Sequence, residues 1–357
     1  MKRHFEILDG LRGTAALLVV VFHLFEAVWP DYTANPLRHG YLAVDFFFLL
    51  SGFVVGYAYD DRWPALTVRE FFRIRLVRLH PMVLLAVVIG VLGHLFDPFL
   101  GPADRVSGLR LSLIAGLGAL LLPAPSLPNH YGETHSLNGP CWSLLQEYVA
   151  NVAYALVGPW LSRRVLLLVV SGSAVALAAT AVGHGHLQGG WGWDTFWMAP
   201  VRVAFPFFAG LLLFRSEWRL RVPAAYALLS AVLLLVFAAP AFQPAGYYEA
   251  FCVLVVFPLV VAAGTGSPVG GAWVALCRFS GRISYPLYLV HYPFIYVFTH
   301  WVQARHPPMT QVLPVMVGLT GFFVALAWAA LRFYDEPVRA WLNARHRLVA
   351  AIRPENA

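Results

Sequence analysis

Long apolar runs separated by short polar connections make up most of this chain. Eleven runs approach the ~20 residues that a helix needs to cross the hydrocarbon core of a membrane. They cover residues 11–28, 41–59, 76–96, 109–124, 140–159, 165–182, 195–214, 223–241, 249–265, 283–304 and 312–332. No connection is long enough for a soluble domain. The pattern therefore predicts an all-helical, polytopic integral membrane bundle.

The composition strengthens this prediction. Hydrophobic residues make up 59% of the 357 positions and charged residues 12%, whereas soluble domains carry about 25% charged residues. These proportions exclude a soluble enzyme, a disordered chain, a disulfide scaffold and a nucleic-acid binder. Cys141, Cys252 and Cys277 lack the spacing of metal ligands and are expected to be buried free thiols.

Arginines concentrate in the connections and give a net charge of +7. The positive-inside rule then places both termini in the cytoplasm, with the bundle in a bacterial inner membrane. Two cytoplasmic termini require an even number of crossings, and the run at 109–124 is the weakest candidate. The sequence therefore predicts about ten crossings, with one segment within 97–139 re-entrant or interfacial. Residues 1–340 form the membrane domain in this prediction, and 341–357 form a short basic cytoplasmic tail.

Ionisable side chains inside apolar runs are costly and mark candidate functional sites. Arg12 and His23 are eleven residues apart, which places them on one helix face with an axial separation of about 16 Å. Asp45 has the depth of His23 in the next run, where a carboxylate would fix the imidazole tautomer. The simpler alternatives are an arginine that reaches the interface, a packed histidine, and an aspartate that caps its helix.

A second group lies in the third and fifth runs. Arg75 and Arg78 share a helix face and suit phosphate or pyrophosphate, although such arginines also contact lipid headgroups. Glu147 lies about two turns inside its run and must pair or take up a proton. Trp142, at the start of that run, suits the membrane interface.

The later runs hold two further candidates. Arg202 lies between Pro200 and Pro206, where a kinked helix is expected, and His291 lies inside the tenth run. For each of them, structural pairing and a functional role both remain open. The sequence contains no phosphate-binding loop, dinucleotide-binding glycine motif, HExxH or GxSxG motif, so no metal site is predicted.

Six motifs occur in a fixed order: DGLRGTAALLVVVFH, VDFFFLLSGF, RIRLVRLHP, PCWSLLQE, SYPLYLVHYP and YDEPVR. This order resembles the membrane-bound acyltransferase-3 family. The resemblance implies transfer of an acyl group, usually acetyl, from acyl-coenzyme A to a hydroxyl of a carbohydrate or glycolipid, without a permanently bound cofactor. It places the family's motif residues on Arg12, His23, Arg75, Arg78, Trp142, Ser143, Leu144 and Glu147.

The residues and the resemblance together predict a mechanism. His23 is expected to act as general base, oriented by Asp45 or Glu147. Arg75 and Arg78 would take the coenzyme phosphates, while Arg12 would hold the donor or stabilise the oxyanion. Direct transfer and a transient acyl-histidine both remain open.

Two other classes of function compete with acyl transfer. A transporter or flippase for a lipid-linked sugar would also carry polar groups at membrane depth, but the two halves of this chain show no internal repeat. A non-catalytic scaffold is hard to reconcile with so many buried ionisable groups. The sequence leaves the acceptor, the acyl chain length and the oligomeric state open.

Overall fold

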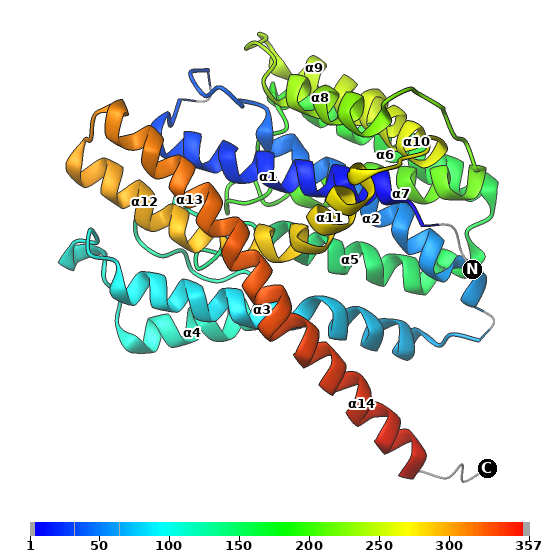
Figure 1. Cartoon of the computed structure of the whole chain (residues 1–357), viewed down its shortest axis with the longest axis horizontal. Helices are drawn as coiled ribbons and strands as arrows, with labels where there is room; N and C mark the ends of the chain where they lie inside the picture. Colours follow the sequence, from blue (N-terminus) through cyan, green and yellow to red (C-terminus); the bar gives the residue numbers. More distant parts are fainter. Residues whose placement is uncertain (1–3, 32, 64, 353–357) are drawn as a thin grey trace.

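The computed structural model describes residues 4–31, 33–63 and 65–352 (Figure 1). The first helices are α1 (Glu6–Val28), α2 (Ala43–Tyr59), α3 (Val68–Phe96), α4 (Gly108–Ala119), α5 (Cys141–Val157), α6 (Arg163–His184) and α7 (Met198–Ser216). The remaining helices are α8 (Ala225–Phe237), α9 (Ala245–Phe251), α10 (Phe257–Gly266), α11 (Ala272–Val290), α12 (Tyr292–Arg305), α13 (Met309–Ala330) and α14 (Glu336–Ile352).

Short helical turns join some of these helices. They are four 3-10 turns, η1 (Gly40–Leu42), η2 (Asp60–Arg62), η3 (Pro102–Asp104) and η4 (Gly158–Trp160), and two π-helical turns, η5 (Cys252–Val256) and η6 (Leu331–Asp335). In the described part of the chain the only extended pairing is an isolated bridge between Glu133 and Gly192.

Each predicted apolar run coincides with one helix or with two consecutive helices, so the prediction of a polytopic helical membrane protein is confirmed. Within the described residues, seven helical stretches are long and apolar enough to cross a membrane by themselves. They are Glu6–Val28, Gly40–Arg62, Val68–Phe96, Arg163–His184, Met198–Ser216, Ala245–Gly266 and Met309–Arg345. The total of about ten crossings stays a prediction, as does the division at residue 340, which falls inside α14.

The region 97–139 contains the segment that was expected not to cross. Its helix α4 has 12 residues, a length of about 18 Å against a hydrocarbon core of about 30 Å. The chain after α4 is irregular, yet residues 133–140 are buried. Its polar groups bond within the segment: Ala124 N donates to Thr134 O at 2.8 Å, and Leu127 N donates to Ser136 Oγ at 3.0 Å. Irregular chain can therefore lie inside the bundle.

The tenth run is divided where the sequence predicted one continuous helix. The helix α11 ends at Val290, His291 forms a bend, and α12 begins at Tyr292. Pro293 explains the break, because proline has no N–H to donate and its ring clashes with the carbonyl of the preceding turn. The break places His291 at a junction between two helices.

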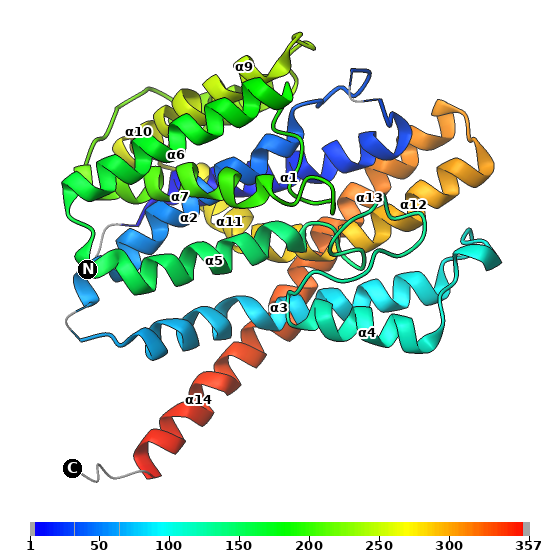
Figure 2. The same ribbon diagram turned by 180° about the vertical axis from the view of Figure 1, so that it is seen from behind.

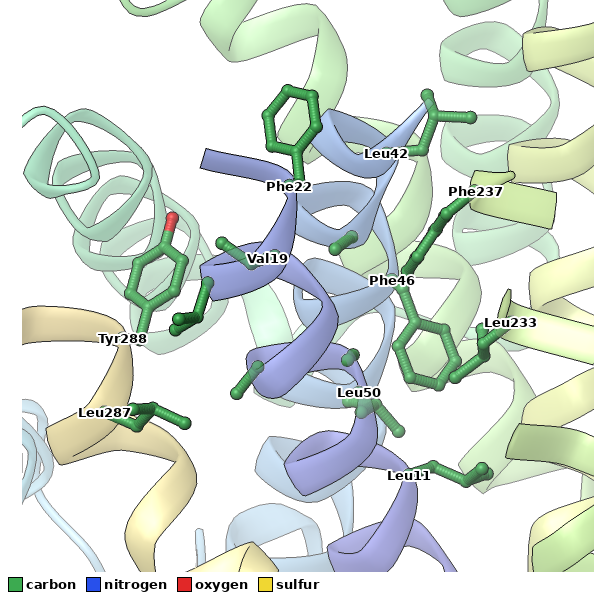
Figure 3. Packing of buried hydrophobic residues seen from close by; sticks show 14 of the residues in the cluster. Leu11, Val19, Phe22, Leu42, Phe46, Leu50, Leu233, Phe237, Leu287 and Tyr288 are labelled. Carbon is green, nitrogen blue, oxygen red and sulfur yellow. The ribbon is translucent and has the colours of Figure 1, made fainter. Parts of the chain in front are cut away.

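The helix α1 lies in the middle of the bundle, packed along α11, while α2 packs along α7 (Figures 1 and 2). Figure 3 shows the apolar side chains of α1 and α2 meeting those of Leu233 and Phe237 in α8. The α2–α7 contact depends on Gly52 and Gly210, because a Cβ at Gly52 would lie 1.8 Å from Phe207 O. Gly52 and Gly210 therefore allow close packing of the two helices. Cys141, Cys252 and Cys277 are buried free thiols, as predicted.

Candidate functional site

Two internal cavities lie beside α1. The first has a volume of about 410 Å³ and is lined by Arg12, Arg75 and Arg78; it is called the arginine cavity below. The second has a volume of about 380 Å³ and includes His23; it is called the histidine cavity. Because Arg12 and His23 belong to one unbroken helix, they are about 16 Å apart along its axis. The helix α1 therefore contributes one polar side chain to each cavity.

The carboxylate partner of His23 is Glu26, one turn further along α1. Nδ1 of His23 lies 2.8 Å from Oε2 of Glu26, and both residues line the histidine cavity. An ionised carboxylate only accepts hydrogen bonds, so Nδ1 carries the ring proton and Nε2 keeps its lone pair. The sequence reasoning missed Glu26 because it searched for a partner on a neighbouring helix. The signal was present as an i,i+3 spacing on one helix face.

Two aromatic side chains hold the His23 ring in place. The ring of His291 stacks on it at a centroid distance of 5.6 Å, and Tyr292 meets it edge-on at 4.7 Å. His291 is fully buried and donates from Nδ1 to Leu287 O at 2.9 Å. His291 thus supports the His23 ring from the junction between α11 and α12.

Asp45 does not pair with His23, contrary to the sequence prediction. It accepts a hydrogen bond from Arg202 Nε at 3.2 Å and a second bond from Arg202 Nη2. Arg202 also donates to Gly189 O at 2.8 Å, and both charged side chains are almost completely buried. Such a pair is tolerated because each charge is matched and hydrogen-bonded. Asp45 and Arg202 therefore tie α2 to α7.

Trp142 is buried inside the protein, with 5% of its surface exposed, and its position at the depth of the membrane interface stays a prediction. The guanidinium of Arg202 lies 5.3 Å from the centroid of its ring, a cation–π contact. The adjacent Ser143 donates from Oγ to Pro140 O at 2.9 Å, and its Oγ lies 2.8 Å from the hydroxyl of Tyr288. The expected Trp-Ser motif therefore forms part of the wall between the two cavities.

Glu147 lies in the arginine cavity, not beside His23. Its Oε1 accepts hydrogen bonds from Arg75 Nη2 at 2.7 Å and from Ser51 Oγ at 2.9 Å. The carboxylate therefore has the cationic partner that the sequence did not reveal. This contact positions Arg75, whose side chain is 4% exposed, on the wall of the arginine cavity.

Arg78 and Arg12, which also line this cavity, are less constrained than Arg75. Arg78 is exposed and makes no ion pair with the described residues. Arg12 has a long contact of 3.5 Å with Asp9. Because Arg12 lines only the arginine cavity, the expected alternative in which it stabilises an oxyanion beside His23 does not fit its position. Its remaining predicted role is to hold an anionic ligand.

The two cavities adjoin at two shared side chains, a boundary that is called the constriction below. Val44 of α2 and Tyr288 of α11 are the two described residues that line both cavities. Both are largely buried, at 8% and 9% exposure. Figure 3 shows Tyr288 beside α1, on the opposite side of that helix from Phe46. A ligand that extends from the arginines towards His23 would pass between these two side chains.

The irregular segment 120–140, of which residues 133–140 are buried, completes the wall of the histidine cavity. Oε1 of Glu133 accepts a hydrogen bond from the hydroxyl of Tyr292 at 2.8 Å, and Oε2 accepts one from the hydroxyl of Tyr296. Burial raises the pKa of the Glu133 carboxyl above its usual value. The sequence did not reveal these three residues, because they lie in an irregular segment or near a helix break. At such positions the depth of a residue in the membrane cannot be counted along a continuous apolar helix.

These observations define a membrane-embedded helical protein that carries polar groups in two adjacent cavities. Residues 5–332 match the acyltransferase domain of the acyltransferase-3 type, and the chain belongs to this family. The resemblance seen in the sequence motifs is thereby confirmed. The protein is an integral membrane enzyme that transfers acyl groups.

Several characterised proteins are similar to this chain. The peptidoglycan O-acetyltransferase OatA of Listeria monocytogenes is 25% identical over 366 residues, covering 95% of this chain and 56% of that protein. The acyltransferase MdmB of Streptomyces mycarofaciens is 28% identical over 319 residues, covering 80% of this chain and 77% of that protein. Protein 2 in the picA locus of Rhizobium radiobacter is 35% identical over 192 residues, covering 50% of this chain and 94% of that protein. No solved structure matches the chain.

Proposed function

We propose that the enzyme transfers an acyl group, with acetyl as the default, from acyl-coenzyme A to a hydroxyl of a carbohydrate or glycolipid. The observation that carries this proposal is that the two cavities lie next to each other and share the lining residues Val44 and Tyr288. One cavity offers cations for an anionic donor, and the other offers a histidine–carboxylate pair for an acceptor. The printed name of the Listeria relative, a peptidoglycan O-acetyltransferase, supports a carbohydrate acceptor.

The donor phosphates would bind in the arginine cavity. Guanidinium groups form paired hydrogen bonds with phosphate oxygens, and Arg12, Arg75 and Arg78 converge on this space. The separation of about 16 Å between Arg12 and His23 along α1 requires a long and narrow ligand. The pantetheine arm of coenzyme A has about this reach, so the thioester would pass the constriction and arrive beside His23.

His23 would act as the general base. Its Nε2 takes the proton of the acceptor hydroxyl while the oxygen attacks the thioester carbonyl carbon. The C–S bond then breaks, and the imidazolium returns the proton to the leaving thiolate, so no proton is gained or lost. Glu26 would act as a positioning residue, because its contact with Nδ1 holds the neutral imidazole in the tautomer whose Nε2 can accept a proton.

The acceptor would bind in the histidine cavity. Aromatic side chains line it, including those of Tyr131, Trp191 and Tyr292. Aromatic rings provide flat apolar surface for the C–H faces of a sugar ring, while Gln188 and Glu26 can bind its hydroxyls. This combination favours a carbohydrate over a fully apolar acceptor.

We further propose an orientation in the bacterial inner membrane with both termini in the cytoplasm. Arg282 and Arg339 line the arginine cavity together with the donor-binding arginines. The positive-inside rule then places the mouth of this cavity on the cytoplasmic side, where acyl-coenzyme A is made. The histidine cavity would receive its acceptor from the outer side.

The test is transfer of radiolabel from [¹⁴C]acetyl-coenzyme A to the carbohydrate fraction of membranes from expressing cells. We expect label with the wild-type enzyme and none with His23→Ala, provided that both proteins are present at equal levels in the membrane. Equal labelling by the two would remove His23 from the chemistry. Movement of a lipid-linked sugar without any acetyl label would instead favour the transporter.

A further inference from the structure

The constriction between the cavities has one wall on α11, formed by the ring of Tyr288. The hydroxyl of Ser143 donates its single proton to Pro140 O, so the 2.8 Å contact between Ser143 Oγ and Tyr288 must use the proton of the tyrosine. Phe47 meets the same ring edge-on at a centroid distance of 5.6 Å. The ring of Tyr288 is therefore held at its tip and along its edge.

The opposite wall is Val44, and its backbone is also fixed. The next residue, Asp45, is bound to Arg202, which joins α2 to α7. Further along the same contact, a Cβ at Gly210 would lie 2.0 Å from Leu49 O, so the two backbones are in direct contact. The helix α2 cannot move away from Tyr288 without breaking the buried ion pair and this close packing.

We infer that Val44 and Tyr288 select acyl groups by their cross-section. This inference rests on the proposed function. An unbranched acyl chain is no wider than the cysteamine and β-alanine part of the pantetheine arm that follows it, so it passes wherever that part of the arm passes. An acyl group branched at the carbon next to the carbonyl is wider than an unbranched one. It would clash with Val44 and Tyr288, which are both held in place. The passage thus admits straight acyl groups and rejects branched ones.

Butyryl-coenzyme A and isobutyryl-coenzyme A provide the sharpest test, because they contain the same atoms and differ only in branching. Release of the free thiol is measured with each donor, and with acetyl-coenzyme A, in membranes of expressing cells, with His23→Ala membranes as the blank. For the wild type we expect kcat/KM to be about tenfold or more higher for butyryl than for isobutyryl, as overpacking at a fixed site costs about this factor.

Val44→Ala removes two methyl groups from the constriction. In this variant the kcat/KM for butyryl-coenzyme A is expected to exceed that for isobutyryl-coenzyme A by no more than about threefold. Val55→Ala is the matched control, because Val55 lies on the same helix, is 1% exposed and lines neither cavity. It is expected to keep the wild-type ratio. Val44→Ile narrows the passage and is expected to increase the ratio, which keeps the test decisive if Val44→Ala fails to fold.

The possible failures can be told apart. Absence of thiol release with every donor would contradict the proposed function itself. Release with acetyl-coenzyme A combined with equal rates for the two isomers in the wild type would overturn the inference. Absence of thiol release with both butyryl- and isobutyryl-coenzyme A would also overturn the inference. The length of the acyl chain inside the histidine cavity would then determine which donors react. An unchanged isomer ratio in Val44→Ala would assign the selection to other residues.

Discussion

The contact between His23 and Glu26 sets the chemistry of the histidine cavity at the scale of single residues. It joins side chains one turn apart on α1, so it needs no other element to form. The carboxylate fixes the proton on Nδ1, and the rings of His291 and Tyr292 fix the plane of the imidazole. A base whose tautomer and plane are both fixed is ready to accept a proton at Nε2.

We predict that Glu26→Ala lowers kcat by on the order of 10²-fold, because general-base catalysis contributes about this much and depends on a correctly oriented base. The KM for the donor should stay the same, since Glu26 does not line the arginine cavity. Glu26→Gln keeps an oxygen that can accept from Nδ1, so it should retain more activity than Glu26→Ala. Steady-state kinetics on matched amounts of protein measure both values, and a rise in donor KM without loss of kcat would contradict the positioning role.

The residues that the sequence placed correctly share one property. Arg12 and His23 belong to a single helix, and their relative position follows from helix geometry alone. The partners of Asp45 and Glu147 depend on how neighbouring helices are rotated, which depth counting does not determine. Asp45 was assigned to His23 at equal depth, but its side chain points to Arg202 on α7.

At the scale of elements, the contact between α2 and α7 positions the constriction. Gly52→Ala would place a methyl group against the backbone carbonyl of Phe207, which no rotamer can relieve. We expect the variant to lose about 3 kcal/mol or more of stability, or to fail to accumulate. Gly172→Ala in α6 is the control, because a Cβ there meets no atom within 4 Å. Thermal unfolding in detergent measures both, and equal midpoints for the two variants would contradict the packing argument.

The helical elements were predictable because apolar length is a strong signal. The break at His291 could not be predicted from the presence of Pro293 in the sequence, because prolines are tolerated inside many membrane helices. The course of segment 120–140 was also beyond prediction. Its burial depends on hydrogen bonds such as that from Asn138 Nδ2 to Leu289 O, at 2.6 Å, between residues far apart in the chain.

At the scale of the whole molecule, the two cavities lie next to each other, and the proposed function uses them as one path, with donor binding at one end and chemistry at the other. Arg78→Ala tests donor binding in the arginine cavity. Arg78 makes no ion pair with the described residues, so its removal leaves no carboxylate without a partner. We predict a rise of about tenfold in the donor KM, the cost of one charge-assisted hydrogen bond, with little change in kcat. Arg69→Ala, at an exposed position of α3 outside both cavities, should leave the KM unchanged.

The central claim is that the acyl group enters from the arginine side and leaves from the histidine side. Sealed vesicles of the two orientations test it directly, since [¹⁴C]acetyl-coenzyme A does not cross the membrane. With the donor outside, inverted vesicles should carry label on carbohydrate in their lumen, and right-side-out vesicles should carry none. Equal labelling in right-side-out vesicles, or label confined to the donor side of inverted vesicles, would contradict a path through the two cavities.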